Sequence, residues 1–397
     1  MSEEDKSYSY PTPFPVLCVV GAGNASHVFI PLFASQGYTV DVYAGYGDEA
    51  ERLLKATETQ PTGIHVCDRR NPGKKREFSG KPRMISKNPQ DVIPKADAII
   101  MALPSFAFRS VFEEIKPHLK PHTIIGKLTV AGIIPMPLNC RILEFGKKVD
   151  FASLKDSYEL AAIPSDQAAP AAKLLSRILR RNVQPLSHFA AIALHASNPN
   201  IHPARLYGLF SDHREGKVYK ENPLFYETFD EKSAEWAQKV SDERIKVWRE
   251  IVRKMKIGEV NEVPQLKEYV MAIYGDQIHD KSSLASVFST NDGFKGFRCP
   301  MKRVGDGWTL NFHNRYFIED IPEGFCVYKG IADLAGVKTP AIDKILGFFQ
   351  KFMNFEFIKD GKLQGRDVGR TKAPQAFGIT TLDEYINGTS RISQSKL

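Results

Sequence analysis

The stretch Val16–Ser26 constrains the fold of this chain more than any other part of the sequence. It reads as a short apolar strand followed by Gly21-x-Gly23-x-x-Ser26, and a helix is expected from about Ala25 to Ser35. Gly21 permits a tight turn, Gly23 lets the backbone approach a phosphate, and the free N–H groups at the start of the helix face an anion. The pattern predicts a turn that holds the pyrophosphate of a dinucleotide, with a plain tight turn between strand and helix as the alternative.

Two features around this turn bear on that choice. The third glycine of the usual pattern is replaced by Ser26, which weakens the match but still allows fairly close packing of helix on strand. The turn also follows directly on residues 1–15, a mostly polar segment that we expect to be a flexible N-terminus, and Rossmann-type domains often begin in this way. The sequence therefore favours a cofactor-binding turn. Its candidate cofactor-binding residues are Gly21, Gly23, Asn24, Ala25 and Ser26.

The segments that follow predict a doubly wound domain. Tyr38–Tyr43 alternates apolar and polar residues and reads as a second parallel strand, whose end would lie beside the adenosine ribose. No Arg or Lys stands there to hold a 2′-phosphate, which favours NAD over NADP. Ala96–Pro104 is an apolar strand whose end lies where such sheets bind ligands, so Pro104 joins the cofactor candidates. Further predicted elements are hairpin-prone strands within residues 62–95, a helix at Val111–Leu119, a strand at Thr123–Gly126 and a helix over Leu160–Asn182.

The second half of the chain has a different character. Ser197–Pro203 contains two prolines within five residues and predicts a domain joint. Beyond it, helical periodicity dominates, as in Lys232–Met255, and strand-like alternation is scarce. A chain of 397 residues fits two domains. The sequence thus predicts an α/β Rossmann-like NAD-binding domain over residues 16–197 and an all-α substrate-binding domain over residues 198–397.

Composition excludes several classes of protein. The net charge of +8 is spread along the chain, which suits small anionic ligands, and no run of aromatics interleaved with Lys or Arg indicates a nucleic-acid partner. The five cysteines are scattered and form no Cys-x-x-Cys pair, so neither a disulfide framework nor a metal site is expected. The acidic, polar N-terminus does not resemble a signal peptide, and no apolar run has the length of a membrane span. We therefore expect a cytoplasmic protein without a membrane partner.

Three residues in the second half could serve a nicotinamide-dependent reaction, in which the protein must supply a proton donor and an anchor for a substrate carboxylate. His202 lies at the predicted joint and titrates near neutral pH, although its spacing fits a helix-start residue before proline better. Arg315 offers a planar fork for a carboxylate, and Asp320 can orient a histidine. A local ion pair is the alternative, and for Asp320 the residues alone slightly favour it.

Eight segments of the chain are long and unusual enough to be compared with known families. They are Gly-Ala-Gly-Asn-Ala-Ser-His (21–27), Asp-Glu-Ala-Glu-Arg (48–52), Pro-Ser-Phe-Ala-Phe (104–108), Cys-Arg-Ile-Leu-Glu-Phe-Gly-Lys-Lys-Val (140–149), Asn-Pro-Asn-Ile-His-Pro (198–203), Asn-Pro-Leu-Phe-Tyr (222–226), Asn-Arg-Tyr-Phe-Ile-Glu-Asp-Ile-Pro (314–322) and Pro-Gln-Ala-Phe-Gly-Ile-Thr-Thr-Leu-Asp (374–383). In this order they resemble the opine dehydrogenase family, in particular its octopine dehydrogenase type.

The resemblance implies an NADH-dependent oxidoreductase that couples the amine of an amino acid to the keto group of pyruvate and reduces the imine to an opine, a secondary amine dicarboxylate. It implies that His202 and Asp320 form a proton-transfer dyad and that Arg315 holds a substrate carboxylate, which reverses the preference for the alternatives above. Cys140 matches a family cysteine near the substrate, and simple packing explains it about as well. Relatives of this type tend to be monomers.

The chain also departs from the family pattern. Tyr269 aligns with a family Trp at the arginine site and Asn198 with a family Tyr, which favours a small amine donor (alanine, glycine, β-alanine or taurine) over arginine. Residues 127–139 are shorter than in relatives, and Val130 replaces a Gln, so contacts to the keto acid are not carried over. Two rival functions stay open: a cleft dehydrogenase that reduces a simple 2-keto acid without an amine, and a non-catalytic NAD-binding module.

Overall fold

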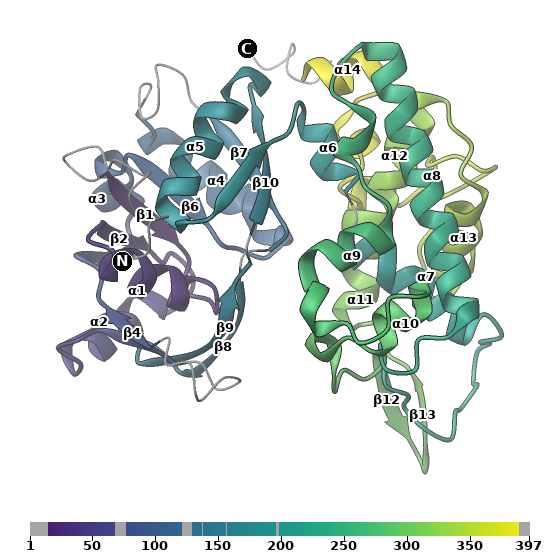
Figure 1. The fold of residues 1–397 in the computed structure, drawn as a ribbon, viewed down its shortest axis with the longest axis horizontal. Helices are drawn as coiled ribbons and strands as arrows, with labels where there is room; N and C mark the ends of the chain where they lie inside the picture. The colour runs from purple at the N-terminus through teal and green to yellow at the C-terminus, as the bar shows by residue number, and fades with distance from the viewer. Residues whose placement is uncertain are drawn as a thin grey trace. The chain divides into compact units, whose positions relative to one another are not determined.

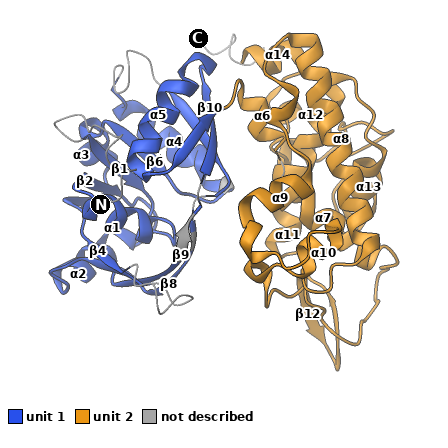
Figure 2. Ribbon diagram, in the orientation of Figure 1, with its two compact units in different colours: residues 1–185 blue, residues 186–397 orange. Residues whose placement is uncertain are grey.

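The structure, a computed structural model, describes residues 15–67, 77–120, 129–136, 138–155, 157–195 and 198–388. Residues 1–14 of the expected flexible N-terminus and the predicted strand Thr123–Gly126 lie outside the described residues. The chain forms two compact units, residues 1–185 and 186–397, shown in blue and orange in Figure 2. The boundary between the units therefore lies at Pro185 and Leu186, before the predicted joint at residues 197–198.

A parallel four-stranded sheet organises the first unit (Figure 1). Its strands are β1 (Val16–Val20), β2 (Thr39–Tyr43), β5 (Met84–Ser86) and β6 (Ala98–Met101). The order is β5-β2-β1-β6 and every pairing is parallel. The apolar sequence of β1 suits a strand covered on both faces, because Leu17 and Val19 join one hydrophobic cluster while Cys18 and Val20 join another. This strand order is that of one half of a doubly wound sheet, so the predicted Rossmann-like domain is confirmed.

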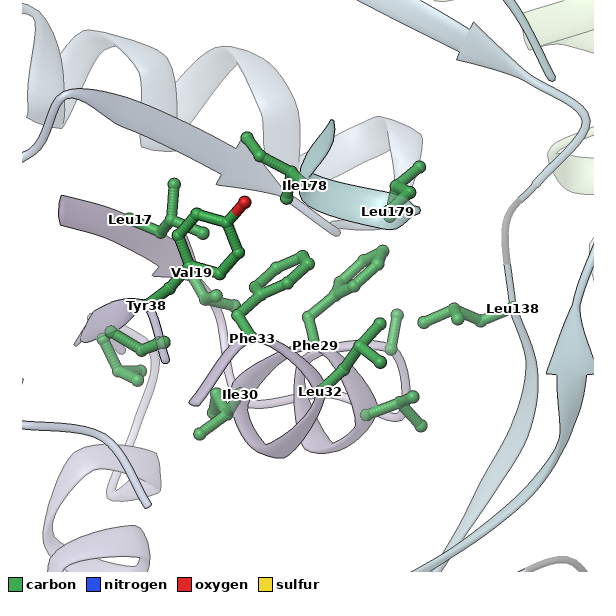
Figure 3. Close-up of a cluster of buried hydrophobic side chains, with 14 of the residues drawn as sticks. Leu17, Val19, Phe29, Ile30, Leu32, Phe33, Tyr38, Leu138, Ile178 and Leu179 are labelled. Atoms are coloured by element: carbon green, nitrogen blue, oxygen red, sulfur yellow. The ribbon is translucent and has the colours of Figure 1, made fainter. Parts of the chain in front are cut away.

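Helix α1 (Ser26–Ser35) starts where the glycine turn ends and covers one face of this sheet. Figure 3 shows Phe29 and Phe33 of α1 beside Leu17, Val19 and Tyr38, and the two phenylalanine rings stack with their centroids 5.3 Å apart. Each such buried side chain contributes roughly 1.5–3 kcal/mol through removal from water. This packing fixes the start of α1 relative to the end of β1, which is what a dinucleotide-binding turn requires.

Three more helices come next in the first unit after α1. They are α2 (Glu49–Glu58), α3 (Pro89–Val92) and α4 (Phe108–Ile115). The helix predicted at Val111–Leu119 therefore starts and ends earlier, and a 3-10 turn at Lys116–His118 takes over. Pro117 explains the early end, because proline has no N–H to continue the helical hydrogen bonds.

Two further sheets complete the first unit. One has the order β4-β3-β9-β8 and the other β11-β10-β7. Their strands are β3 (Ile64–Cys67), β4 (Phe78–Gly80), β7 (Val130–Ile134), β8 (Leu138–Glu144), β9 (Lys148–Leu154), β10 (Ser157–Ile163) and β11 (Asn182–Pro185). The antiparallel pairing of β3 with β4 fits the hairpin-prone interpretation of residues 62–95.

The single helix predicted over Leu160–Asn182 is wrong at both ends. Residues 160–163 belong to β10, α5 occupies only Ala168–Leu179, and Asn182 begins β11. Leu160, Ala161 and Ala162 are buried in the sheet. A short, wholly apolar run of this kind carries no periodicity, so sequence alone does not distinguish a buried strand from a helix.

The second unit is built from helices, with one β-hairpin between α10 and α11. Its elements are α6 (Phe189–Ala193), α7 (Asn198–Phe210), α8 (Glu231–Met255), α9 (Leu266–Tyr274), α10 (Leu284–Ser289), β12 (Met301–Val304), β13 (Gly307–Leu310), α11 (Arg315–Ile318), a π-helical turn (Ile321–Phe325), α12 (Cys326–Ala335), α13 (Pro340–Met353) and α14 (Leu382–Asn387). Asp230 caps α8 by accepting a hydrogen bond from the Ser233 N–H. The predicted helical second domain is confirmed. Within the described part of the chain, no helix has the length and apolar character that crossing a bilayer requires.

The segment predicted to be a domain joint forms the start of α7. Pro199 lies in the first turn, where a missing N–H is tolerated, but Pro203 lies inside the helix. Asn200, Ile201 and His202 are buried together with the residues that follow. Tertiary packing therefore keeps the segment helical despite an internal proline, and the interruption expected from two prolines does not occur.

Candidate active site

The glycine turn after β1 has the backbone that its sequence predicts. Gly21 has φ +93°, a conformation that side chains with a Cβ rarely adopt, and a Cβ there would lie 2.8 Å from Cδ2 of Leu103. A Cβ at Gly23 would meet nothing within 4 Å, so the backbone at this position is open. Gly21 thus makes the turn, and Gly23 leaves room in front of it.

Two side chains from the turn and α1 fasten it to the neighbouring sheet. Oδ1 of Asn24 accepts a hydrogen bond of 2.7 Å from the N–H of Ile142. The buried ring of His27 joins the carbonyl of Gly23 through Nδ1 (2.9 Å) and accepts the N–H of Gly146 at Nε2 (2.8 Å). Burial lowers the pKa of His27, which suits a neutral ring. Asn24, a predicted cofactor residue, therefore has a structural role in holding the turn.

The residues around the turn fit a dinucleotide. No acidic residue lies in the first turn of α1 to oppose an anion. The hydroxyl of Ser26 is buried and, within the described residues, has no hydrogen-bond partner. It can therefore donate a hydrogen bond to a ligand at the start of α1. Glu49, at the first position of α2, supplies the acidic group that is missing at the end of β2: burial raises its pKa, and a hydrogen bond from the Ala22 N–H partly offsets this rise.

The second unit brings His202 and Asp320 together from positions far apart in the sequence. Nδ1 of His202, on α7, lies 2.7 Å from Oδ2 of Asp320, which immediately precedes the π-helical turn. The His202 ring is 3% exposed, and its face stacks on Tyr316 with the ring centroids 4.0 Å apart. Nε2 of His202 lies 2.9 Å from the hydroxyl of Tyr226. A buried imidazole between a carboxylate and a phenol can hold or release one proton while its ring stays fixed.

Arg315 makes the local ion pair that the sequence left open, but with Glu319 rather than Asp320. Its Nη2 lies 2.9 Å from Oε1 of Glu319, and its Nε contacts the second carboxylate oxygen. The Arg315 side chain is 73% exposed, and Glu319 raises its pKa. An exposed i,i+4 pair of this kind is weak, so its carboxylate partner can be exchanged.

The remaining predicted residues are placed as follows. Tyr269 is half-buried on α9 and packs edge-on against His195, with the ring centroids 4.6 Å apart. Asn198 is exposed at the start of α7. Cys140 is half-buried on β8, and burial raises the pKa of its thiol to about 11, so it stays protonated at neutral pH. Pro104 is exposed after β6, and Ala25 is buried before α1.

Buried Arg244 links the segments that carry several of these residues. Its guanidinium donates to the carbonyls of Leu194 and Pro264 at 2.6 Å each, and its Nε donates to Oδ1 of Asn200 at 3.2 Å. These acceptors lie beside His195, just before α9 and in the first turn of α7. Burial lowers the pKa of Arg244 to about 10, so it remains charged at neutral pH. One side chain thus fixes the relative positions of α7 and α9.

Sequence reasoning did not assign roles to three residues that the structure places at this site: Tyr226, Tyr316 and Glu319. Tyr226 ends the segment Asn-Pro-Leu-Phe-Tyr, and the other two lie inside Asn-Arg-Tyr-Phe-Ile-Glu-Asp-Ile-Pro. Both segments stood out as unusual, which was the available signal. What the sequence did not show is that Tyr226 meets His202 across 24 residues of chain.

A Rossmann-type sheet with a glycine turn, followed by a helical unit with a buried histidine–carboxylate pair, defines a dehydrogenase architecture. The sequence family described as NAD/NADP octopine/nopaline dehydrogenase, alpha-helical domain, matches residues 185–353. The chain is 33% identical to tauropine dehydrogenase of Arabella iricolor over 94% of its own length and 100% of that protein. It is 30% identical to octopine dehydrogenase of Pecten maximus, over 94% and 98% of the two chains. The protein belongs to the opine dehydrogenase family.

Solved structures agree with this assignment. The structure of octopine dehydrogenase in complex with NADH and agmatine matches with a TM-score of 0.84 at 28% identity, covering 95% of this chain and 99% of the other. A second octopine dehydrogenase structure, with NADH and L-arginine, matches with a TM-score of 0.83 at 29% identity and the same coverage. The predicted family, the two-part fold and the oxidoreductase class are therefore confirmed.

Proposed function

We propose that this protein is an opine dehydrogenase that joins a small amino acid to pyruvate with NADH as the reductant. The observation that carries the proposal is the contact of 2.7 Å between Nδ1 of the buried His202 ring and Oδ2 of the part-buried Asp320. Family membership supports it, since the similar proteins are named tauropine, octopine and opine dehydrogenases. The similar solved structures are named as complexes of octopine dehydrogenase with NADH.

The cofactor would be held by the first unit. Gly21, Gly23 and the first turn of α1, including the Ser26 hydroxyl, would hold the pyrophosphate. The carboxylate of Glu49 beside the turn favours a free ribose hydroxyl over a 2′-phosphate, which it would repel, so NADH is preferred to NADPH. When bound, the reduced nicotinamide supplies the hydride.

In the second unit, His202 would hold the proton that the reaction consumes. The Asp320 carboxylate accepts the Nδ1–H and thereby orients the ring and stabilises its protonated form. The protonated ring gives up one proton as the keto acid and the amine condense with loss of water and the imine is reduced. Arg315 would bind a substrate carboxylate by exchanging its Glu319 partner for it. Burial of His202 keeps water away from the proton.

We further propose that the amine donor is small: alanine, glycine, β-alanine or taurine. The family resemblance aligns Tyr269 and Asn198 with a Trp and a Tyr of octopine-forming relatives, which would reduce the surface that faces a long guanidinium chain. The 33% identity to a tauropine dehydrogenase supports this choice. The same proposal includes the location and the oligomeric state: the protein acts as a monomer in the cytoplasm. Light scattering of the purified protein tests whether it is a monomer.

The function is tested by following NADH consumption with pyruvate alone and with pyruvate plus each amine, arginine included. We expect turnover only when an amine is present and a higher kcat/KM for at least one small donor than for arginine. Turnover with pyruvate alone would establish a simple keto-acid reductase instead. NADH binding without turnover for any pair would establish a non-catalytic module.

The Tyr269→Trp variant sharpens the same assay. Restoring the larger ring is expected to raise kcat/KM for arginine relative to the small amines, and Tyr269→Phe serves as the matched control that keeps ring size. If both variants leave the amine preference of the wild type unchanged, Tyr269 does not determine the amine donor.

A further inference from the structure

Both ring nitrogens of His202 are held by side chains. Nδ1 lies 2.7 Å from the Asp320 carboxylate, and Nε2 lies 2.9 Å from the Tyr226 hydroxyl. A carboxylate only accepts, so Nδ1 carries a hydrogen. In the neutral ring Nε2 must then accept, and the partner that can donate to it is the Tyr226 O–H. The structure therefore implies the Nδ1–H tautomer for neutral His202.

Tyr226 is itself held firmly and keeps its proton. Its ring is buried, stacks on Phe294 with the centroids 4.3 Å apart, and contacts Phe225 edge-on. Burial, together with neighbouring Tyr316, Tyr274 and Asp320, raises its pKa well above the ordinary value for a phenol. The hydroxyl next to His202 is thus a neutral O–H on a ring that packing prevents from turning away.

A hydroxyl differs from an amide or a carbonyl because it can both donate and accept. When His202 is neutral, the Tyr226 O–H donates to Nε2; when His202 is protonated, Nε2–H donates to the Tyr226 oxygen. The second bond involves a charged donor and is the stronger of the two. The buried ring therefore has partners for both nitrogens in both of its charge states.

We propose that Tyr226 is a positioning residue for the proton-transfer pair: until the substrate binds, its hydroxyl holds Nε2 of His202 in both charge states, fixes the neutral tautomer and favours the protonated ring, and it then gives way at Nε2 to the substrate atom that takes the proton. The proposal rests on the function proposed above, in which His202 holds the proton. It extends the Asp320–His202 pair to a group of three side chains, which come from α7, from the segment before α8 and from the residue that precedes the π-helical turn.

Other groups also face His202, and they influence its charge state independently of Tyr226. Asp320 favours the protonated ring by its charge, and the face of Tyr316 packs against it. The Arg315–Glu319 pair lies on the same short segment as Asp320, and Arg315 carries positive charge near that carboxylate. All of these are unchanged when only the Tyr226 hydroxyl is removed.

The first test is the Tyr226→Phe variant, which keeps the buried ring and removes one oxygen atom. Without it, the protonated ring loses the acceptor for Nε2–H, so the reductive reaction should fall off at lower pH than in the wild type, by roughly half a pH unit to one unit. We expect kcat to fall about tenfold, with less change in the KM of either substrate.

Tyr219→Phe is the matched control. Tyr219 also places its hydroxyl beside a histidine, 3.2 Å from Nδ1 of His213, in the same unit but in another aromatic cluster. This variant should keep the pH profile of the wild type. A Tyr226→Phe enzyme whose pH profile matches that of Tyr219→Phe would overturn the proposal.

A second measurement depends neither on turnover nor on the folding of the Tyr226→Phe variant. Nitrogen-15 NMR of histidine-labelled wild-type protein, with His202 assigned through His202→Gln, reports which ring nitrogen carries the hydrogen at high pH. We expect the Nδ1–H tautomer with a hydrogen-bonded Nε2. The Nε2–H tautomer would overturn the role of Tyr226 even in an active enzyme, whereas the expected tautomer in a protein without amine-dependent turnover would leave the contact intact and refute the proposed function.

Discussion

Two buried histidines, one in each unit, are held in contrasting ways. His27 joins the Gly23 carbonyl at 2.9 Å and the Gly146 N–H at 2.8 Å, so both of its partners are backbone groups. His202 lies between the Asp320 carboxylate at 2.7 Å and the Tyr226 hydroxyl at 2.9 Å, so both of its partners are side chains. The two rings are similarly buried.

The difference lies in what the partners can do when a proton arrives. A backbone N–H can only donate, so protonating Nε2 of His27 would set two donors against each other, and burial further lowers its pKa. A carboxylate and a hydroxyl accept a protonated ring without rearrangement. Backbone partners thus make His27 a neutral fastener of the glycine turn, whereas side-chain partners let His202 change charge in place.

The largest expected effect separates the two histidines by activity. His202→Ala should lower turnover by roughly 10²–10⁴-fold, because it removes the group that holds the proton, while the affinity for NADH stays nearly unchanged. Steady-state kinetics and a fluorescence titration with NADH measure the two quantities. Near-wild-type turnover in this variant would remove His202 from the mechanism and make the two histidines equivalent fasteners.

The next effect separates them by stability. His27→Phe keeps a buried ring next to Phe145 but leaves the Gly146 N–H without its partner and removes the side-chain hydrogen bond to the Gly23 carbonyl, which keeps the backbone N–H of residue 27, at a cost of about 1–3 kcal/mol. Urea unfolding of the full chain should show this loss, and NADH should bind more weakly because the turn is no longer held. His65→Phe is the matched control. The ring of His65 makes a hydrogen bond of 3.1 Å to another side chain, that of Ser79, and not to the backbone of the glycine turn. Equal losses in the two variants would contradict the fastening role.

How far the sequence predicts each site follows from where its partners lie. The glycine turn is local: Val16–Ser26 contains the strand, the turn and the helix start, and the structure has all three where the sequence places them. The bond from His27 to Gly146, however, spans 119 residues, and no pattern in the sequence indicates it. The sequence therefore predicts the shape of the turn but not what fastens it.

The second site depends on long-range contacts throughout. His202 and Asp320 are 118 residues apart, and spacing alone favoured a simpler role for each; only the resemblance to a family paired them. The helix predicted over Leu160–Asn182 was wrong for a related reason. Residues 160–163 are buried in a sheet as part of β10, and a short apolar run of this kind looks the same in sequence whether it forms a strand or a helix. Tertiary packing, which a linear pattern does not contain, decides both cases.

A smaller effect concerns acid. The pKa of His27 is lowered in the folded protein, so below about pH 6.5 the unfolded chain binds a proton that the folded chain does not, and stability falls as the pH falls. The loss should be roughly 1 kcal/mol over the first pH unit below that value. Comparing wild type with His27→Phe at pH 7.5 and pH 5.5 isolates this contribution from that of other groups. The variant should lose less stability on acidification, and equal losses would show that His27 does not resist protonation.

The smallest expected effect extends the comparison to an arginine. The Arg315–Glu319 pair is formed by side chains and is exposed, so a substrate carboxylate can displace Glu319. Glu319→Gln weakens this competition and should lower the KM of the carboxylate substrate a few-fold, while the free energy of unfolding changes by less than about 0.5 kcal/mol.

Kinetics at two salt concentrations measure this effect, since screening by salt weakens the pair in the wild type and should narrow the difference between the two proteins. Glu323→Gln, a carboxylate on the neighbouring π-helical turn, is the control for a change of charge alone. If Glu319→Gln raises KM, Glu319 orients Arg315 rather than competing for it, and the pair would then resemble the fixed contacts of His27 more than the exchangeable contacts of His202.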